Sequence, residues 1–407
     1  MDILAINCGS STLKFEVFEI RRAGIIPELE RIAGGLVERI GGQADIELRS
    51  QGNAWHETLP VADHDEASRL ALDWLSSKGV LKDDELAGVG HRVIHGGDKF
   101  SGPTIINDDI IAAIESFTAL APLHNKPSLE AIRAVRKIVG PSVPMVAVFD
   151  TAFHRTLTES ACRYAIPLEL AEKHHIRRYG FHGLAHRYMM ERYSAITGAP
   201  LQKTRLVTLQ LGNGCSVTAI SNGQSVDTSM GFTPLEGLIM GTRSGNVDPT
   251  LVGFLARQEK TDIKTAEDLL NMKSGLLGIS GRSRDMRELL DAERKGDRRA
   301  ALAVEMFCYR IKEYIGAYMA VLGGADAIVF GGGIGENAPE VRARACSGLE
   351  WCGLSLDSQR NMAAIGKEAA IHTDDARIGA YVIPVDEAVI IARDTLTCLS
   401  GRRRKNG

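Results

Sequence analysis

Short apolar runs alternate with longer amphipathic stretches along most of the chain. Five runs are rich in aliphatic residues and end in or run into Gly, Asn or Asp: residues 86–97, 143–153, 204–214, 325–333 and 380–387. Between Asp297 and Leu322, apolar residues recur at spacings of three and four, and Gly323 and Gly324 follow, which predicts a long helix with a glycine stop. Strands that alternate with helices are typical of an α/β fold.

Two segments that lie far apart in the sequence share one plan. "LAINCGSSTLKFEVF" at 4–18 and "VTLQLGNGCSVTAI" at 207–220 each consist of an apolar strand, a turn of small residues and a second apolar strand. Each pattern predicts a β-hairpin, and the repetition suggests a duplicated unit, with coincidence as the alternative. A glycine-containing turn leaves backbone N–H groups open, and such groups can hold phosphate.

A glycine-rich segment, "IVFGGGIGEN" at 328–337, follows the predicted long helix. It does not fit a dinucleotide-binding fingerprint, because Glu336 stands where the third glycine would be needed. A P-loop is excluded as well, since the only Gly-Lys pair, Gly366 and Lys367, is followed by Glu368. The ligand of this segment therefore has to be inferred in another way.

Composition narrows the function classes. The chain has 407 residues, 44% of them hydrophobic, which favours two domains over one. A formal net charge of -3 argues against nucleic-acid binding. Seven cysteines without a Cys-x-x-Cys pair fit reduced thiols in the cytosol. Neither a signal peptide nor an apolar run of about 18 residues is evident, so we expect a soluble, cytoplasmic protein without membrane contact.

Nine motifs, in order along nearly the whole chain, resemble those of acetate kinases, which belong to the actin, hexokinase and Hsp70 superfamily. They are "NCGSSTLKF" (7–15), "GHRVIHGG" (90–97), "LAPLHN" (120–125), "VFDTAFH" (148–154), "YGFHGLAH" (179–186), "LGNGCS" (211–216), "DTSMGFTPLEGLIMGTRSGNVDP" (227–249), "SRDMR" (283–287) and "GGGIGEN" (331–337). The resemblance implies two duplicated ribonuclease-H-like α/β domains with an active-site cleft between them. One domain would comprise residues 1–150 and 387–407, and the other residues 151–386.

The implied reaction transfers the γ-phosphoryl group of ATP to acetate, or the reverse. A carboxylate nucleophile is already ionised at neutral pH, so we expect catalysis by positioning and by cations that stabilise charge. The resemblance assigns catalytic roles to Asp150, His182 and Arg243. We interpret Asp150 as orienting Mg²⁺ and Arg243 rather than as transferring a proton. The implied substrate-binding residues are Arg92, Ile94, Leu123, Phe181 and Pro234, and His124 and His154 are weaker candidates.

The ATP site implied by the resemblance draws on four parts of the chain. Its residues are Lys14, Gln210, Leu211, Gly212, Asn213, Gly214, Asp285, Met286, Arg287, Gly333, Ile334, Gly335, Glu336 and Asn337, with Met286 considered tolerable against the adenine ring. Asn7 and Glu387 match the positions that hold Mg²⁺, for which Mn²⁺ is a possible substitute. Ser10 and Thr12 add hydroxyl groups near the first hairpin turn.

Several alternatives stay open. Ile94 replaces a valine common in the family, and its extra methylene favours acetate over propionate or butyrate, although kinases for those acids remain the alternative. A nucleotide-gated binding protein is a further alternative, against which the two predicted arginines argue. His182 and His186 have a His-x-x-x-His spacing, but Gly183 replaces the glutamate of a zinc motif. Gln210 stands where the family usually has His, and Thr12 stands where it usually has Ser. The resemblance also implies a homodimer.

Overall fold

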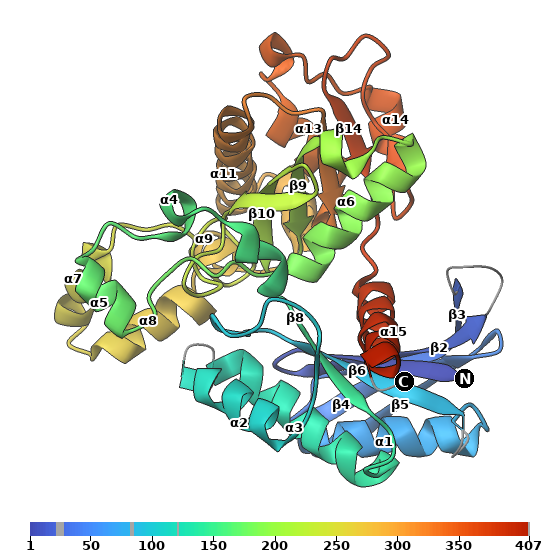
Figure 1. Cartoon of the computed structure of the whole chain (residues 1–407). Coiled ribbons are helices and arrows are strands. Elements are labelled where there is room, and N and C mark those ends of the chain that lie inside the picture. Colours follow the sequence, from blue (N-terminus) through green and yellow to red (C-terminus); the bar gives the residue numbers. More distant parts are fainter. Residues whose placement is uncertain (22–27, 82–84, 120–121, 406–407) are drawn as a thin grey trace. The chain divides into compact units, whose positions relative to one another are not determined.

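The computed structural model describes residues 1–21, 28–81, 85–119 and 122–405, without the side chains of residues 119, 122–124 and 402–405. It divides into two compact units, which are coloured along the sequence in Figure 1. The first unit comprises Met1–Ala152 and Asp386–Gly407, and the second comprises Phe153–Val385. Each unit is built around one β-sheet.

The sheet of the first unit contains eight strands in the order β5-β4-β3-β2-β1-β6-β8-β7. Strands β1 to β5 pair with one another in antiparallel fashion, β1, β6 and β8 run parallel to one another, and β7 is antiparallel to β8. The bounds are β1 Asp2–Cys8, β2 Thr12–Arg21, β3 Glu28–Glu38, β4 Gly42–Ser50, β5 Asn53–Val61, β6 Leu86–Val93, β7 Thr104–Ile105 and β8 Met145–Phe149.

Helices cover this sheet. They are α1 His64–Ser77, α2 Asp108–Ser116, α3 Pro122–Val139 and α15 Glu387–Lys405. Helix α15 packs on β1, β6 and β8, although more than 230 residues of sequence separate it from them. Gly90 in β6 permits this contact, because a Cβ there would lie 2.2 Å from Thr395 Oγ1 and 2.7 Å from Ile391 Cγ2. The glycine therefore fixes how closely α15, which begins at Glu387, approaches the sheet.

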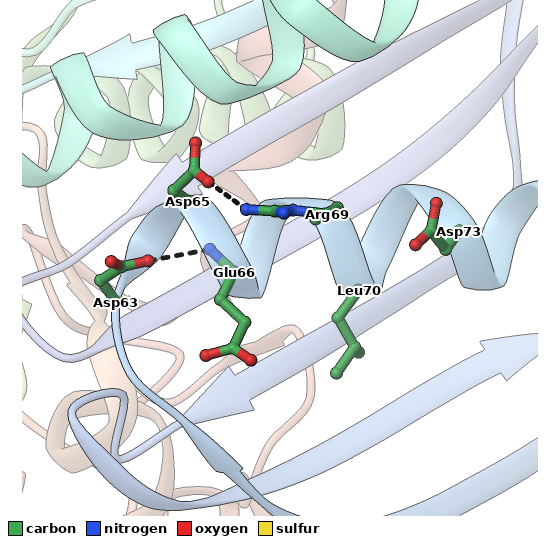
Figure 2. Close-up of a pocket in the computed structure, with 6 residues that line it drawn as sticks. All are labelled: Asp63, Asp65, Glu66, Arg69, Leu70 and Asp73. Carbon is green, nitrogen blue, oxygen red and sulfur yellow. Dashed lines mark hydrogen bonds and ion pairs between the residues drawn. The ribbon is translucent and has the colours of Figure 1, made fainter.

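Two carboxylates cap the start of helix α1. The Asp63 carboxylate accepts the backbone N–H of Glu66 at 2.9 Å, and the Glu66 carboxylate accepts that of Ala62 at 2.7 Å. Asp65 also pairs with Arg69 one turn later. Figure 2 shows that these side chains border a hollow along the helix, which is lined by Asp63, Asp65, Glu66, Arg69, Leu70 and Asp73. The acidity of this hollow thus reflects helix capping and pairing within α1.

The sheet of the second unit repeats the central part of the first. Its order is β11-β10-β9-β12-β14-β13. Three antiparallel strands are followed by two parallel ones, as in β3-β2-β1-β6-β8 of the first unit. The predicted hairpins are the pairs β1–β2 and β9–β10, which confirms a duplicated fold. The bounds are β9 Arg205–Leu211, β10 Cys215–Ser221, β11 Gln224–Thr228, β12 Ala327–Gly331, β13 Ala369–Ala370 and β14 Gly379–Val382.

The predicted long helix is α11, Arg298–Leu322. Asp297 caps it by accepting the N–H groups of Arg299 and Ala300, and Gly323 ends it with a φ of 64°. Helix α11 packs on β10 and β9, and α6 packs on β9 and β12. The other helices are α4 Glu159–Cys162, α5 Leu168–Lys173, α6 Gly183–Thr197, α7 Thr250–Gln258, α8 Ile263–Met272, α9 Gly275–Ser280, α10 Met286–Arg294, α12 Gly332–Asn337, α13 Pro339–Cys346 and α14 Ser358–Ala363.

All seven cysteines are free thiols, and five of them are buried. Burial raises the pKa of Cys8, Cys215, Cys308 and Cys346 to about 12 in each case. These four side chains are therefore protonated at neutral pH and belong to the apolar interior. Among the helices of the described residues, none is both long and apolar enough to span a membrane.

Candidate active site

One group of polar residues gathers at the carboxyl edge of the first sheet. Asn7 lies near the end of β1, Arg92 near the end of β6, and Asp150 directly after β8, while Glu387 is the first residue of α15. Because β1, β6 and β8 are parallel neighbours, their carboxyl ends meet at one edge, which is where ligands of open α/β sheets bind. The fold thus brings together four residues predicted for catalysis, substrate or metal.

Arg92 is the centre of this group. Its Nη1 donates to Asn7 Oδ1 at 2.9 Å, and its Nη2 donates to Asp150 Oδ2 at 2.6 Å. Its Nε lies 3.8 Å from Glu387 Oε2, which also accepts a hydrogen bond from Asn7 Nδ2 at 2.7 Å. The Arg92 side chain is 11% exposed and that of Asp150 only 1%. One buried cation therefore faces two carboxylates.

The balance of charge at this edge suits a divalent cation. Burial raises the pKa of the Glu387 carboxyl, Arg92 opposes that shift, and the Asp150 charge adds to it. A carboxylate and an amide oxygen are ligand types that Mg²⁺ accepts, with waters completing its shell. In the part of the chain that the structure describes, no cluster of three or more His, Cys, Asp or Glu could hold a metal. The residues present fit a Mg²⁺ ion held through Asn7, Glu387 and waters.

A second group of polar residues lies in the second unit. His182 caps the start of α6 with a left-handed φ of 57°, and Gly214 ends the turn between β9 and β10. A Cβ on Gly214 would lie 3.4 Å from His182 Nε2 and 3.5 Å from Arg243 Nη1. The imidazole and the guanidinium therefore flank the same glycine, so that both can reach one small ligand beside it.

The Arg243 guanidinium is buried. Its Nη1 donates to the carbonyl oxygen of Pro234 at 3.2 Å and approaches Met240 Sδ at 3.7 Å. No carboxylate of the described residues pairs with it, and burial lowers its pKa from the usual value, an effect that Cys215 opposes. A buried charge that lacks a counter-ion is costly. The arrangement fits a site whose anion is supplied by a ligand.

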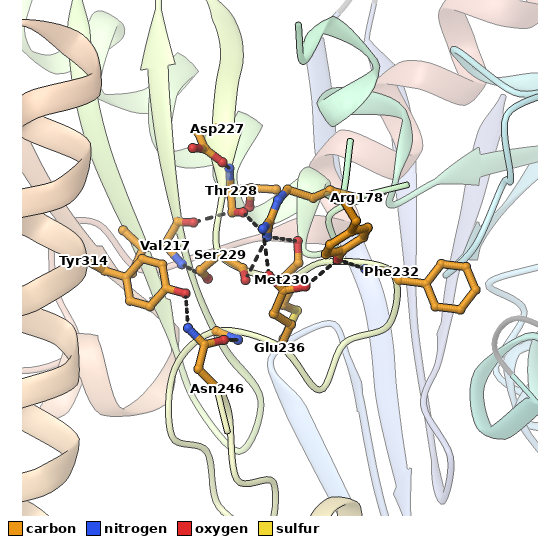
Figure 3. Close-up of polar contacts among 12 residues, drawn as sticks. Arg178, Val217, Asp227, Thr228, Ser229, Met230, Phe232, Glu236, Asn246 and Tyr314 are labelled. Atoms are coloured by element: carbon orange, nitrogen blue, oxygen red, sulfur yellow. Dashed lines mark hydrogen bonds and ion pairs between the residues drawn. The ribbon is translucent and has the colours of Figure 1, made fainter. Parts of the chain in front are cut away.

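A clamp around Arg178 holds the loop that carries Pro234 and Arg243. Figure 3 shows Arg178 beside Glu236 and the backbone of Thr228. Arg178 Nη1 donates to the carbonyl oxygen of Thr228 at 2.9 Å, and its Nη2 donates to Glu236 Oε1 at 2.6 Å. The other Glu236 oxygen accepts the Tyr164 hydroxyl. We call Tyr164, Arg178 and Glu236 the Arg178 clamp. None of these three residues was a predicted site residue, although Arg178 directly precedes the "YGFHGLAH" motif.

The far end of the same loop is fixed to helix α11. Asn246 Oδ1 accepts the backbone N–H of Gly237 at 2.8 Å, and its Nδ2 donates to the Tyr314 hydroxyl at 2.8 Å. The contact between Asn246 and Tyr314 can be followed in Figure 3. The conformation of the loop is therefore set by groups on both sides of Arg243.

Behind His182 lies a buried chain of hydrogen bonds. His182 Nδ1 is 2.9 Å from Ser216 Oγ, which is 2.7 Å from His186 Nε2. His186 Nδ1 is in turn 2.8 Å from Thr208 Oγ1. Burial holds the pKa of His186 well below its usual value, so its ring is neutral. Ser216 and Thr208 were not among the predicted site residues, since a hydroxyl on an apolar strand gives no recognisable signal.

The predicted glycine-rich segment is the junction between β12 and helix α12. Gly332 has a φ of 74°, and a Cβ there would lie 2.6 Å from the carbonyl oxygen of Leu211. The segment therefore packs directly on the end of β9, beside the turn that contains Gly212, Asn213 and Gly214. A Cβ on Gly333 would meet no atom within 4 Å, so backbone at this position is open to a ligand.

Side chains around α12 bind protein groups. Glu336 Oε1 accepts the backbone N–H of Val385 at 3.0 Å, and Asn337 Nδ2 donates to the carbonyl oxygen of Gly333 at 2.9 Å. Arg342 is fully buried, and its Nη1 donates to the carbonyl oxygen of Gly335 at 2.8 Å. Contacts from this segment to a nucleotide would therefore come chiefly from its backbone.

The predicted residues 285–287 open helix α10. Asp285 caps the helix and pairs with Arg287, whose Nη2 lies 2.6 Å from Asp285 Oδ2. The Arg287 side chain is 87% exposed. Met286 is only 3% exposed, so its side chain packs in the core. Its place against an adenine ring stays a prediction.

The remaining predicted residues are placed as follows. Ile94 and Phe181 are buried, His154 is held by Ser225 and the carbonyl oxygen of Phe181, and Lys14 Nζ lies 3.8 Å from Glu16 Oε1. The side chains of Leu123 and His124 lie outside the described residues. Gln210 Oε1 is buried at the end of β9 and has no hydrogen-bond partner in the described structure, which makes it available to a ligand or water.

Comparisons with known proteins identify the family. The sequence model of the acetokinase family matches residues 2–393. Acetate kinase of Solibacter usitatus is 48% identical over 409 residues, which cover 98% of this chain and 99% of that protein. Acetate kinase of Chloroherpeton thalassium is 46% identical over 416 residues, with 98% and 99% covered.

Solved structures agree with the sequence comparison. Acetate kinase of Porphyromonas gingivalis superposes with a TM-score of 0.89 at 41% identity, covering 98% of this chain and 99% of that chain. A propionate kinase from Francisella tularensis has the same TM-score at 38% identity, covering 97% and 99%. With two duplicated units, buried cations at the candidate site and these matches over nearly its whole length, the chain belongs to the acetokinase family.

Proposed function

We propose that the chain is an acetate kinase, which transfers the γ-phosphoryl group of ATP to acetate and gives acetyl phosphate and ADP, reversibly. Acetate kinases among its relatives, which match over nearly the whole chain, support the reaction class. The observation that carries the proposal is the buried Arg243 guanidinium, which has no carboxylate among the described residues and flanks Gly214 together with His182. Such a pair suits the negative oxygens of a phosphoryl group.

In this mechanism the protein does little proton transfer. The acetate carboxylate is already an anion, so it can attack phosphorus directly, and the protein's role is to position the reactants and stabilise charge. His182 and Arg243 would donate to the equatorial oxygens of the transferring group, and Arg243 can form two parallel hydrogen bonds. Both donors are fixed before substrate binds, so little reorganisation is needed in the transition state.

Arg92 would bind the carboxylate or acyl phosphate through its guanidinium, which Asp150 and Asn7 hold in place. Asp150 would thereby act as a positioning residue for Arg92. Its expected role toward Mg²⁺ and Arg243 stays a prediction. Mg²⁺, or Mn²⁺ in its place, would be held by Asn7 and Glu387 with waters, and when bound it neutralises charge on the phosphates. Glycine backbone at 212–214 and 332–335 would line the nucleotide site.

The choice of acid would depend on the apolar residues that the resemblance assigns to the acyl group, Ile94 in the first unit and Phe181 and Pro234 in the second. Ile94 and Phe181 are both buried. One methylene in an apolar pocket discriminates between substrates by roughly 1–3 kcal/mol. We therefore propose acetate as the preferred acid. Propionate is the second candidate, because one of the similar structures is a propionate kinase.

Acyl phosphate formation tests this function. Hydroxylamine traps the acyl phosphate, so the assay measures hydroxamate from acetate, propionate and butyrate with ATP and Mg²⁺. We expect the highest kcat/KM on acetate and a loss of about 100-fold or more in Arg243→Ala. Arg205→Ala is the matched control, because Arg205 is half exposed and pairs with Asp326 at 3.4 Å in the same unit. No hydroxamate from folded protein would refute the kinase, and a preference for propionate would refute the pocket argument.

Two further statements belong to the same proposal. Free, buried thiols fit a reducing compartment, which supports a cytoplasmic location. The family implies a homodimer, and light scattering of the purified protein measures its mass directly. A mass near 44.0 kDa at micromolar concentration would exclude the dimer.

A further inference from the structure

We propose that Thr208, His186 and Ser216 form a donor chain that fixes His182 as the neutral tautomer with its proton on Nε2. These three residues are positioning residues, and they act only through His182. The role of the chain in catalysis rests on the proposed function, because it concerns the hydrogen bond that His182 would donate to the phosphoryl group. The tautomer itself can be measured without any substrate.

The fold places these four side chains in line. Gln210 and Thr208 are two residues apart on β9, so their side chains point to the same face of the sheet. Ser216 on β10 pairs with Gln210, which puts its hydroxyl on that face as well. His186 lies one turn beyond His182 on α6, which covers β9. The His-x-x-x-His spacing thus serves a hydrogen-bond chain rather than a metal site.

The direction of hydrogen-bond donation along the chain is decided at Thr208. If Thr208 donates to His186 Nδ1 at 2.8 Å, His186 must donate from Nε2 to Ser216 at 2.7 Å. Ser216 then donates to His182 Nδ1 at 2.9 Å, and the neutral His182 ring carries its proton on Nε2. Every hydroxyl proton in this arrangement reaches a ring nitrogen at a short distance.

The opposite direction is less favourable at Thr208. There the Thr208 hydroxyl would accept from His186, and its own proton would go to the carbonyl oxygen of Thr218 at 3.5 Å. A contact of that length is a weak hydrogen bond beside one of 2.8 Å. His186 cannot satisfy both directions by taking a second proton, because burial keeps its ring neutral.

The proton on Nε2 lies beside Arg243. His182 Nε2 and Arg243 Nη1 lie 3.4 and 3.5 Å from one point, the Cβ position of Gly214. An Nε2–H group therefore places a hydrogen-bond donor next to the guanidinium, so that both groups can donate to the oxygens of one phosphoryl group.

Histidine ¹⁵N chemical shifts measure the tautomer directly. The protein contains 11 histidines, so selectively labelled samples give a manageable spectrum, and His182→Asn identifies the signal of interest. At pH 7.5 we expect a protonated Nε2 and an unprotonated Nδ1 for His182. Thr208→Val removes the first donor at nearly constant volume and should shift His182 toward a mixture of tautomers. Thr208→Ser should restore the wild-type signal.

Kinetics give the second readout. Thr208→Val should lower kcat about tenfold with the KM for acetate unchanged, because the hydrogen bond is used in the transition state. Thr218→Val is the matched control, since Thr218 bonds to Thr228 at 2.9 Å and stands outside the chain. A wild-type His182 that carries its proton on Nδ1, or on both nitrogens, would overturn the proposal whatever the activity. A His182 that carries its proton on Nε2, in a protein without kinase activity, would refute the proposed function but support the donor chain.

Discussion

The substitution Gly214→Ala would place a methyl group between His182 and Arg243. Its Cβ would lie 3.4 Å from His182 Nε2 and 3.5 Å from Arg243 Nη1, which are ordinary van der Waals distances. Gly214 is not among the residues with positive φ, so alanine can adopt its backbone conformation. We therefore expect the variant to fold, with a change in the free energy of unfolding below about 1 kcal/mol.

Activity should respond very differently. A phosphoryl oxygen that bonds to either donor needs a distance of about 2.8–3.0 Å, and the methyl group occupies that space. Hydrogen bonds to charged groups contribute about 1.5–3 kcal/mol, and a neutral donor about 1 kcal/mol. Loss of both amounts to roughly 2.5–4 kcal/mol of transition-state stabilisation, which corresponds to a decrease in kcat/KM of about 70- to 900-fold at 1.36 kcal/mol per factor of ten.

The hydroxamate assay and urea denaturation, run on the same preparation, separate the two effects. Gly316→Ala in α11 is the control, because its Cβ would meet no atom within 4 Å and alanine favours a helix. That variant should keep full activity and gain up to about 1 kcal/mol of stability. A stable Gly214→Ala protein with wild-type kcat/KM would refute the reasoning, since the phosphoryl group could not then lie between these donors.

Three further predictions concern the clamp, the pH dependence of stability and the metal. Glu236→Ala should lower kcat, and it should lower the free energy of unfolding by about 1–3 kcal/mol, with a matching fall in melting temperature, because Arg178 loses its partly buried counter-ion. Glu236→Gln should lose less stability. Equal stability of the wild type and both variants would contradict the clamp. Burial lowers the pKa of His91 to about 3 and that of His95 to about 4. Below pH 6.5 the unfolded chain therefore takes up protons on these residues that the folded chain does not. The free energy of unfolding should be highest above pH 6.5 and fall by up to about 1.4 kcal/mol per pH unit for each residue as the pH decreases, which urea titrations at pH 7 and pH 5 would measure. His91→Asn should make that slope shallower, and an unchanged slope would refute the assignment. Glu387→Gln should raise the Mg²⁺ concentration for half-maximal activity about tenfold or more, whereas an unchanged Mg²⁺ dependence would exclude Glu387 as a ligand.

The strands, the two hairpins and the long helix could be predicted because their signals are local. Helix α11 has its cap at Asp297 and its stop at Gly323, both of which are readable from single residues. The hairpin turns at 9–11 and 212–214 follow from glycines between alternating apolar runs. The resemblance of nine motifs then supplied the family, which the comparisons confirm.

Partners of buried polar groups could not be predicted in the same way. Glu236 lies 58 residues from Arg178 and 72 from Tyr164 in the sequence, and only the packed loop brings the three together. Thr208 and Ser216 occupy strand positions where a small polar residue is compatible with many neighbours. Met286 shows another limit, because its place in the "SRDMR" motif does not reveal that its side chain is buried at the start of α10.

The buried cysteines give each unit its own reporter of opening. Thiol reagents attack the thiolate, so side chains with a pKa raised to about 12 by burial react only when the surrounding structure opens. Cys8 lies in the first unit, and Cys215, Cys308 and Cys346 lie in the second. Mass spectrometry after timed alkylation would therefore follow the opening of either half of the enzyme separately, without an introduced cysteine, and would tell whether the two duplicated halves unfold together or one after the other.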